Sequence, residues 1–148
     1  MEREIWFDMD GTIADLYGVE DWLPMLIAED ATPYKIAKPM VNMNTLARRL
    51  NMLQKNGYKI GVISWLSKSS TPTYDALVSE AKMKWLKRHL GSVNFDRVDI
   101  VAYGTPKWKG RKGILFDDER RNRDEWDIHL VGEAYEPHEI LEVLKVLP

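Results

Sequence analysis

The sequence contains no cysteine among its 148 residues. This absence excludes disulfide frameworks, thiolate nucleophiles, thiolate zinc sites and iron–sulfur clusters, and it fits a reducing, cytoplasmic setting. Long apolar runs are absent too, since no stretch approaches the roughly 20 apolar residues of a membrane span, so we expect no membrane association. A bound metal would therefore need oxygen or imidazole ligands.

Strong charge of either sign is also lacking. The 21 basic and 23 acidic residues leave a formal net charge of −2, which disfavours binding of extended nucleic acid through bulk charge. With 45% apolar and 30% charged residues, the composition is that of a globular protein. A chain of this length predicts one domain, residues 1–148.

Short runs of β-branched and aromatic residues predict five strands. They are residues 5–7, 58–64, 98–102, 113–116 and 128–131. Helical spacing of apolar residues predicts helices at residues 44–55, 71–91 and 137–147, the second of which begins at Thr71 and Pro72. Because strands alternate with helices, we expect an α/β fold, a Rossmann-like three-layer sandwich with a five-stranded parallel sheet.

The helix at residues 71–91 has apolar side chains that we expect to face the core. They are Leu77, Ala81, Trp85, Leu86 and Leu90. Residues 15–43 do not follow the alternation, because this segment is longer than the usual loop of about two to six residues. We interpret it as a small flap or cap over the site.

Polar side chains follow four of the predicted strands. Asp8 and Asp10 follow the first strand, Ser64 ends the second, Lys107 follows the third, and Asp117 and Asp118 follow the fourth. In a parallel sheet, ligands gather beyond the carboxyl ends of the strands. The clustered carboxylates predict a hard cation such as Mg²⁺, while the lysine and the hydroxyl suit phosphate oxygens.

Each of these residues also has a structural interpretation. Acids at strand ends commonly serve as turn or helix-cap residues, and Asp117, Asp118 and Glu119 could simply begin the next helix. That interpretation does not explain why acids, a hydroxyl and a lysine end four successive strands. The combination therefore favours a functional site.

The same residues carry a family resemblance. The segment Asp8-Met9-Asp10-Gly11-Thr12, the strand ending in Ser64, Lys107 and the Asp117-Asp118 pair resemble, in order, the four motifs of the haloacid dehalogenase (HAD) superfamily of phosphohydrolases. These motifs cover the whole chain. The resemblance implies a HAD-like core that carries a minimal cap after the first strand, at residues 15–43.

Within that superfamily, three features are similar to the 5′(3′)-deoxyribonucleotidases. They are the extension of the first motif to Asp15, the ten-residue spacing between Lys107 and Asp117, and the helix that carries Lys84-Trp85. The chain departs from the pattern after Asp15, where that family prefers an aromatic residue and this chain has Leu16. The cap of this chain is also shorter than the cap of that family.

The resemblance implies a mechanism. Asp8 would be the nucleophile that forms an aspartyl-phosphate, and Asp10 would act as general acid and then as general base. Mg²⁺ would be held by the Asp8 carboxylate, the Asp10 main-chain carbonyl, Asp117 and, directly or through water, Asp118. Ser64 and Lys107 would bind the transferring phosphoryl group.

Two nearby lysines, Lys109 and Lys112, are alternatives to Lys107 as the phosphate-binding residue. The spacing to Asp117 favours Lys107, and the other two fit a solvated basic turn. For the rest of the substrate, the candidate contacts are Thr12, Trp22, Tyr34 and Trp65, of which the aromatic residues lie in the flap or just after Ser64.

The resulting hypothesis is a Mg²⁺-dependent phosphatase for a small phosphomonoester such as a (deoxy)nucleoside monophosphate. One alternative keeps the chemistry but acts on a phosphorylated end of an oligonucleotide, as in the related phosphatase domains of polynucleotide kinases. Another alternative is a catalytically silent, HAD-like binding module. The sequence does not fix the leaving group or the oligomeric state.

Overall fold

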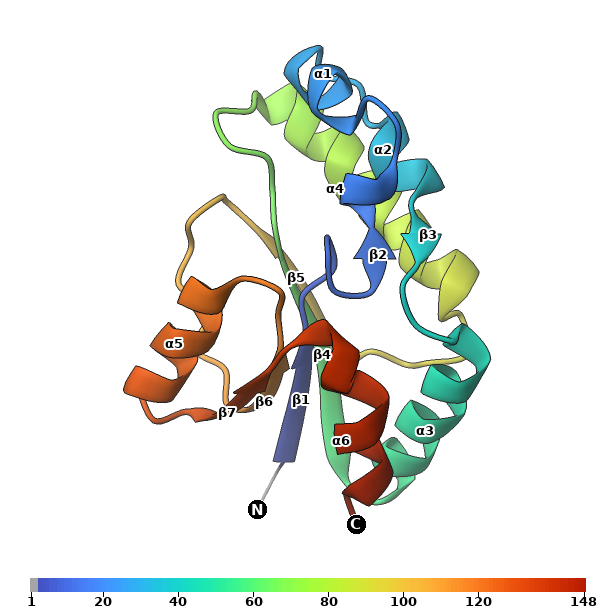
Figure 1. Cartoon of the computed structure of the whole chain (residues 1–148), viewed down its shortest axis with the longest axis vertical. Helices are drawn as coiled ribbons and strands as arrows, with labels where there is room; N and C mark the ends of the chain where they lie inside the picture. The colour runs from blue at the N-terminus through green and yellow to red at the C-terminus, as the bar shows by residue number, and fades with distance from the viewer. Residues whose placement is uncertain (1–2) are drawn as a thin grey trace.

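The computed structural model describes residues 3–148, which form a five-stranded parallel sheet (Figure 1). The strands are β1 (Arg3–Phe7), β4 (Tyr58–Trp65), β5 (Arg97–Val101), β6 (Gly113–Phe116) and β7 (Gly132–Tyr135). Their order is β5-β4-β1-β6-β7, and every neighbouring pair is parallel. The predicted α/β fold class is confirmed.

Helices cover both faces of this sheet. Successive residues of a strand point to opposite sides, so each face has its own set of packed side chains. On one face, Ile5, which pairs with both Ile60 and Ile114, packs with side chains of α3 (Met43–Lys55) and α6 (Ile140–Val146). On the other face, Trp6, Ile63 and Leu115 pack against Trp126 of α5 (Arg120–Ile128). Central β1 is therefore buried on both sides, which places the residue after it inside the molecule.

The helix starts follow ordinary capping chemistry. Asn42 precedes α3, and its side chain accepts a hydrogen bond from the Thr45 amide at 3.0 Å. Thr71 does the same for α4 (Pro72–His89), accepting from the Tyr74 amide at 3.2 Å. The last predicted helix divides into a 3₁₀ turn, η2 (Pro137–Glu139), and α6.

The predicted strand at residues 128–131 is wrong. Helix α5 continues to Ile128, and the strand of this region is β7, beginning at Gly132. Ile128 and Leu130 are 72% and 90% exposed, and Leu130 has a φ of 55°, so this apolar run forms the end of a helix and a turn. The short apolar run that predicts a strand here consists largely of exposed residues.

The buried face of α4 also differs from the prediction at one position. Leu77 is 46% exposed. The inward stripe near it consists of Tyr74, Val78, Ala81, Lys82 and Trp85. A lysine therefore occupies a core position of this helix.

Residues 15–43 form what we call the cap, at the top of Figure 1. It contains η1 (Leu16–Gly18), α1 (Trp22–Ile27), α2 (Thr32–Ile36) and β3 (Lys38–Pro39), which pairs antiparallel with β2 (Ala14–Asp15). Tyr34 of α2 packs with Tyr74, Val78 and Ala81 of α4. The Tyr74 hydroxyl donates to the Asp30 carbonyl at 3.0 Å, so the cap is fastened to α4.

Within residues 3–148, none of the helices combines the length and the apolar character needed to cross a membrane.

Candidate active site

The turn after β1 presents the first motif to the carboxyl edge of the sheet. The Met9 carbonyl accepts hydrogen bonds from the amides of Thr12, Ile13 and Ala14, each at 3.0 Å. Gly11 has a φ of 80°, and a Cβ there would lie 2.3 Å from Asp118 Oδ2. Glycine therefore permits both the turn and the close approach of the acidic pair after β6.

Both carboxylate oxygens of Asp8 are oriented by neighbours. Lys107 Nζ donates to Oδ1 at 2.9 Å, and Thr12 Oγ1 donates to Oδ2 at 2.8 Å. The Asp8 amide donates to the Phe116 carbonyl at 2.9 Å, which joins this residue to β6. Asp8 is 7% exposed and faces a cavity, so it is a fixed carboxylate that a substrate can reach.

Lys107 links Asp8 to Asp117, the residue after β6. Its Nζ donates to Asp117 Oδ2 at 2.7 Å, and the Asn122 amide donates to the same oxygen at 3.2 Å. Burial alone would lower the pKa of Lys107, but the charges of Asp8 and Asp117 raise it above its usual value. An ammonium has three donors, two of which serve these carboxylates, so the third is available for a phosphate oxygen.

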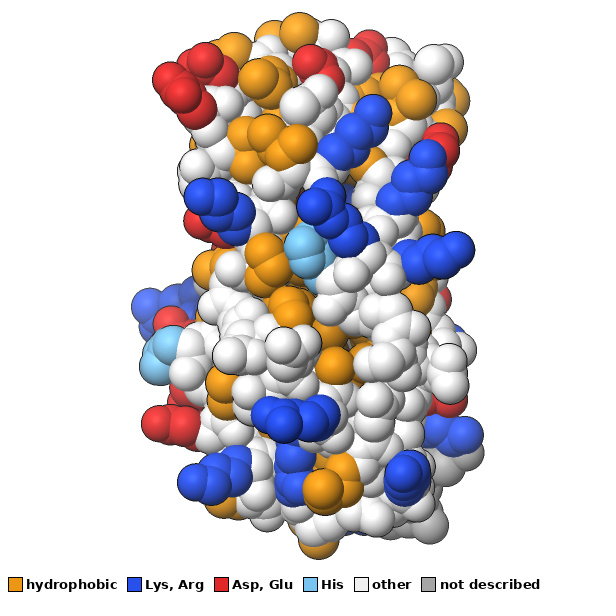
Figure 2. Space-filling view, turned by 90° about the vertical axis from the view of Figure 1, so that its right-hand side faces the viewer, with side chains coloured by type: hydrophobic (Ala, Val, Ile, Leu, Met, Phe, Trp, Pro, Cys, Tyr) orange, Lys and Arg blue, Asp and Glu red, His pale blue; other side chains and the backbone are white. Residues whose placement is uncertain are grey.

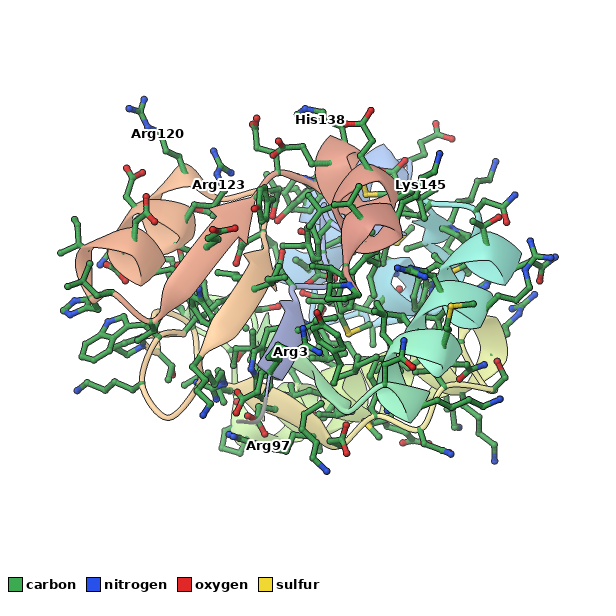
Figure 3. All side chains as sticks on the ribbon, turned by 90° about the horizontal axis from the view of Figure 1, so that it is seen from below. Arg3, Arg97, Arg120, Arg123, His138 and Lys145 are labelled. Atoms are coloured by element: carbon green, nitrogen blue, oxygen red, sulfur yellow. The ribbon has the colours of Figure 1, made fainter. Side chains whose placement is uncertain are left out.

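A second link runs from α5 to the same strand end. Arg123, labelled in Figure 3, lies on α5, and its Nη1 donates to the Asp117 carbonyl at 3.0 Å. The Glu119 amide donates to Asp117 Oδ1 at 2.9 Å. Asp117 is thus held by both its main chain and its side chain.

The carboxylates of Asp8, Asp117 and Asp118 fit a divalent cation. One oxygen from each lies within 4.8 Å of the others. Burial and the charge of Asp8 raise the pKa of Asp117 above the usual carboxyl range, and burial, a hydrogen bond with Asp8 and its charge raise the pKa of Asp118. Together with Asp8, these two carboxyl groups form an oxygen donor set suited to Mg²⁺.

Asp10 takes a different partner. Its Oδ2 accepts from Lys82 Nζ of α4 at 3.0 Å. Burial and the charge of Asp8 raise the pKa of Asp10, and Lys82 opposes this rise. A carboxyl group with a raised pKa at the floor of a cavity suits proton transfer.

Ser64 is fully buried and is not part of the cavity wall. Its Oγ accepts from Lys82 Nζ at 2.7 Å. Thr12 is likewise fully buried, and its hydroxyl donates a hydrogen bond to Asp8. The roles of Ser64 in phosphate binding and of Thr12 in substrate binding stay predictions.

A cavity of about 340 Å³ opens above these groups. Its polar floor includes Asp8, Asp10, Lys107 and Asp118. Its wall carries five aromatic side chains, namely Tyr17, Trp22, Tyr34, Trp65 and Tyr103. Ring centroids are 4.9 Å apart in the pair from Tyr17 and Trp22, and 5.0 Å apart in the pair from Trp65 and Tyr103.

The structure places Trp22, Tyr34 and Trp65 in the cavity wall, and their contact with a substrate stays a prediction. The alternative lysines, Lys109 and Lys112, are exposed and do not line it.

Sequence reasoning missed Lys82 and Asn122 at the polar site, and it did not name Tyr17 or Tyr103 of the cavity wall. The signal for Lys82 was present: it lies four residues after Val78 and three before Trp85, on the buried stripe of α4. Asn122 follows Asp117 by five residues within charged α5 and gave no comparable signal.

No protein-family model and no curated protein sequence matches this chain. Among solved structures, it resembles the crystal structure of D,D-heptose 1,7-bisphosphate phosphatase from Burkholderia thailandensis, with a TM-score of 0.55 and 11% sequence identity. The match covers 98% of this chain and 99% of that chain. The likeness shows that this chain shares its fold with that phosphatase. The resemblance to the deoxyribonucleotidases stays a prediction.

Proposed function

We propose that this protein is a Mg²⁺-dependent phosphatase that hydrolyses phosphomonoesters through an aspartyl-phosphate. The observation that carries the proposal is the placement of Asp8 at the cavity floor, 2.9 Å from a lysine that also binds Asp117. The two aspartates and the lysine come from three different parts of the chain. The fold shared with a known phosphatase supports the same conclusion.

Hydrolysis proceeds in two displacements. Asp8 attacks phosphorus, the bond from phosphorus to the ester oxygen breaks, and Asp10 gives its proton to the leaving oxygen. Asp10 then takes a proton from water, whose oxygen attacks phosphorus. The bond to Asp8 breaks, which releases inorganic phosphate and restores both carboxyl groups.

The side chains around Asp8 offset the negative charge of the phosphoryl group. Lys107, with its third donor, binds an oxygen of the phosphoryl group and offsets the charge that develops on it. Asp8, Asp117, Asp118 and the Asp10 carbonyl would hold Mg²⁺. When bound, the ion neutralises the carboxylates and phosphate oxygens that would otherwise repel one another.

The substrate we propose is a (deoxy)nucleoside monophosphate. The cavity wall is largely aromatic and apolar above an acidic floor, which suits a flat base joined to a phosphate. Trp22 of the cap and Trp65 after β4 contribute rings from different elements. A sugar phosphate without a base would have no flat group to stack on these rings.

A substrate panel tests this function. Wild-type protein and the Asp8→Asn variant are assayed with and without Mg²⁺ on nucleoside monophosphates, sugar phosphates, an aryl phosphate and 5′- or 3′-phosphorylated oligonucleotides. We expect turnover that needs both Mg²⁺ and Asp8, with nucleoside monophosphates preferred. Absence of such turnover on every substrate would leave a binding module as the better interpretation.

Preference for oligonucleotide ends would instead support the alternative substrate. Figure 2 shows lysine and arginine side chains spread over the side of the molecule that carries α3 and β3. No residue of α3 or β3 is among those lining the cavity, within the described part of the chain. The basic residues of this face therefore give no particular support to a nucleic-acid substrate.

A further inference from the structure

Lys82 is a charged residue in a core position. It is 1% exposed and lies on the α4 stripe that includes Val78 and Trp85. Burying an ammonium is costly, and an apolar side chain of similar length would pack there at lower cost. Packing alone therefore does not explain a lysine at this position.

The ammonium of Lys82 binds three acceptors from two strand ends. It donates to Asp10 Oδ2 at 3.0 Å, to Ser64 Oγ at 2.7 Å and to the Trp65 carbonyl at 2.7 Å. Its Nζ also lies 5.1 Å from the centre of the Tyr34 ring, on the cap. Lys82 thus connects the turn after β1, the end of β4 and the cap.

All three donors of this ammonium are used within the protein, so none is free for a phosphate oxygen. Lys107 differs, because only two of its donors are used. Among residues 3–148, Lys82 is the side chain that hydrogen-bonds Asp10, and it occupies Oδ2. The other carboxyl oxygen, Oδ1, accepts no side-chain hydrogen bond within those residues, so we expect it to be the oxygen that meets the substrate.

We propose that Lys82 is a positioning residue that fixes Asp10 for proton transfer to the leaving group. This role rests on the proposed function. Lys82 holds one oxygen of Asp10 against the end of β4 and thereby sets the direction of the other. Because proton transfer requires hydrogen-bond distance, a displaced Asp10 loses its effect on ester cleavage.

The dependence on the leaving group provides the test. A nitrophenolate departs without a proton, whereas an alkoxide needs one, so a misplaced Asp10 slows cleavage of alkyl phosphates selectively. We compare kcat/KM of wild type and Lys82→Met on p-nitrophenyl phosphate and on an alkyl ester, deoxythymidine monophosphate. We expect a loss of about 100-fold on the alkyl ester and under about 10-fold on the aryl ester.

Two further variants complete the design. Lys84→Met, on the same helix, removes an exposed ammonium paired with Glu80 and is expected to change neither rate. Asp10→Asn should show the same selectivity as Lys82→Met. The double variant should be no slower than Asp10→Asn alone, because Lys82 acts through Asp10.

Equal losses on both esters, no loss on either, or additive losses in the double variant would overturn the role of Lys82. Thermal melting establishes that each variant is folded. If Lys82→Met does not fold, Lys82→Arg, which retains the charge but spreads its donors in a plane, makes the same comparison with the same selectivity expected. A wild type without Mg²⁺- and Asp8-dependent turnover contradicts the proposed function itself, which separates the two failures.

Discussion

Lys107 Nζ lies 2.9 Å from Asp8 Oδ1, although the two residues are 99 positions apart in the chain. We predict that Lys107→Met lowers kcat/KM by about 100- to 1,000-fold, as the loss of one donor to a developing charge does in other enzymes. Phosphate affinity should fall as well, because the third donor of the ammonium is lost. Steady-state kinetics with inorganic phosphate as inhibitor measure both effects.

The control is Lys109→Met, which removes an exposed ammonium that lies outside the cavity. Its kinetics should match those of the wild type. If Lys109→Met is as slow as Lys107→Met, Lys107 is not the phosphate-binding lysine.

The acidic cluster predicts that Mg²⁺ stabilises the protein more at higher pH. Burial raises the pKa of Asp117 and of Asp118, so their protonated forms favour the folded state. This contribution is complete below the usual carboxyl pKa of about 4 and is lost as the pH rises through the raised values. Mg²⁺ binds the carboxylates and reverses that loss, so its increment in Tm should be larger at about pH 8 than at about pH 5.

Melting with EDTA and with Mg²⁺ at both pH values checks this prediction. Asp118→Asn removes one of the carboxylates. At the higher pH, Mg²⁺ should therefore raise the Tm of this variant by less than it raises the Tm of the wild type. An increment that is the same at both pH values in the wild type contradicts the assignment of the cluster to a cation.

Trp22 is predicted to select substrates with a base. Trp22→Ala removes a half-buried ring of the cavity wall. Stacking on one base is worth about 1–3 kcal/mol, so kcat/KM for nucleoside monophosphates should fall by roughly 10-fold or more. Glycerol phosphate, which has no base, is the control substrate and should be hydrolysed at an unchanged rate. Unchanged kinetics on both substrates would remove Trp22 from the binding site.

Gly113, the first residue of β6, is predicted to be sensitive to substitution because of a close backbone approach. A Cβ there would lie 2.1 Å from the Glu4 carbonyl oxygen, and its φ is 93°. Gly110 also has a positive φ, of 71°, but a Cβ there meets nothing within 4 Å. Gly110→Ala should cost about 1–2 kcal/mol of unfolding free energy, from backbone strain alone.

Gly113→Ala carries the same strain and adds the clash, so its loss should exceed that of Gly110→Ala by more than about 1 kcal/mol. Urea unfolding of both variants measures the difference. Equal losses would show that the backbone of β1 and β6 separates to accept a methyl group.

The sheet and its polar edge were predictable because each depends on local pattern. The strand runs that precede Asp8 and Asp117 are short and apolar. Because the two strands are parallel, their carboxyl ends lie at the same edge of the sheet. The run at residues 128–131 predicts a strand because Ile128 and Leu130 are apolar, although both side chains are exposed. Propensity and alternation do not distinguish an apolar residue that packs from one that faces solvent.

Helix side chains at the site were harder to predict. Lys82 reaches Asp10 because the buried stripe of α4 packs both with the cap and in the main core, and this packing places the helix beside the turn after β1. The sequence shows a lysine among apolar positions but not the partner it meets there. Residues 15–43 stand out in the sequence only because they interrupt the alternation of strands and helices, and the helices of this segment are too short for periodicity to reveal.

Helix α4 belongs to two packing units at once. Tyr74 and Val78, toward its start, pack with the cap, and Trp85 and Leu86, toward its end, pack in the core beneath the sheet. The Trp85 indole also donates to the Ala37 carbonyl at 2.8 Å, which ties the far end of the cap to the same helix. If the cap moved as one body, α4 would have to move with it, and this movement would disrupt the packing of the main core. Under the proposed function, substrate and product would then pass through an opening that stays in place, and its width limits the size of the alcohol released.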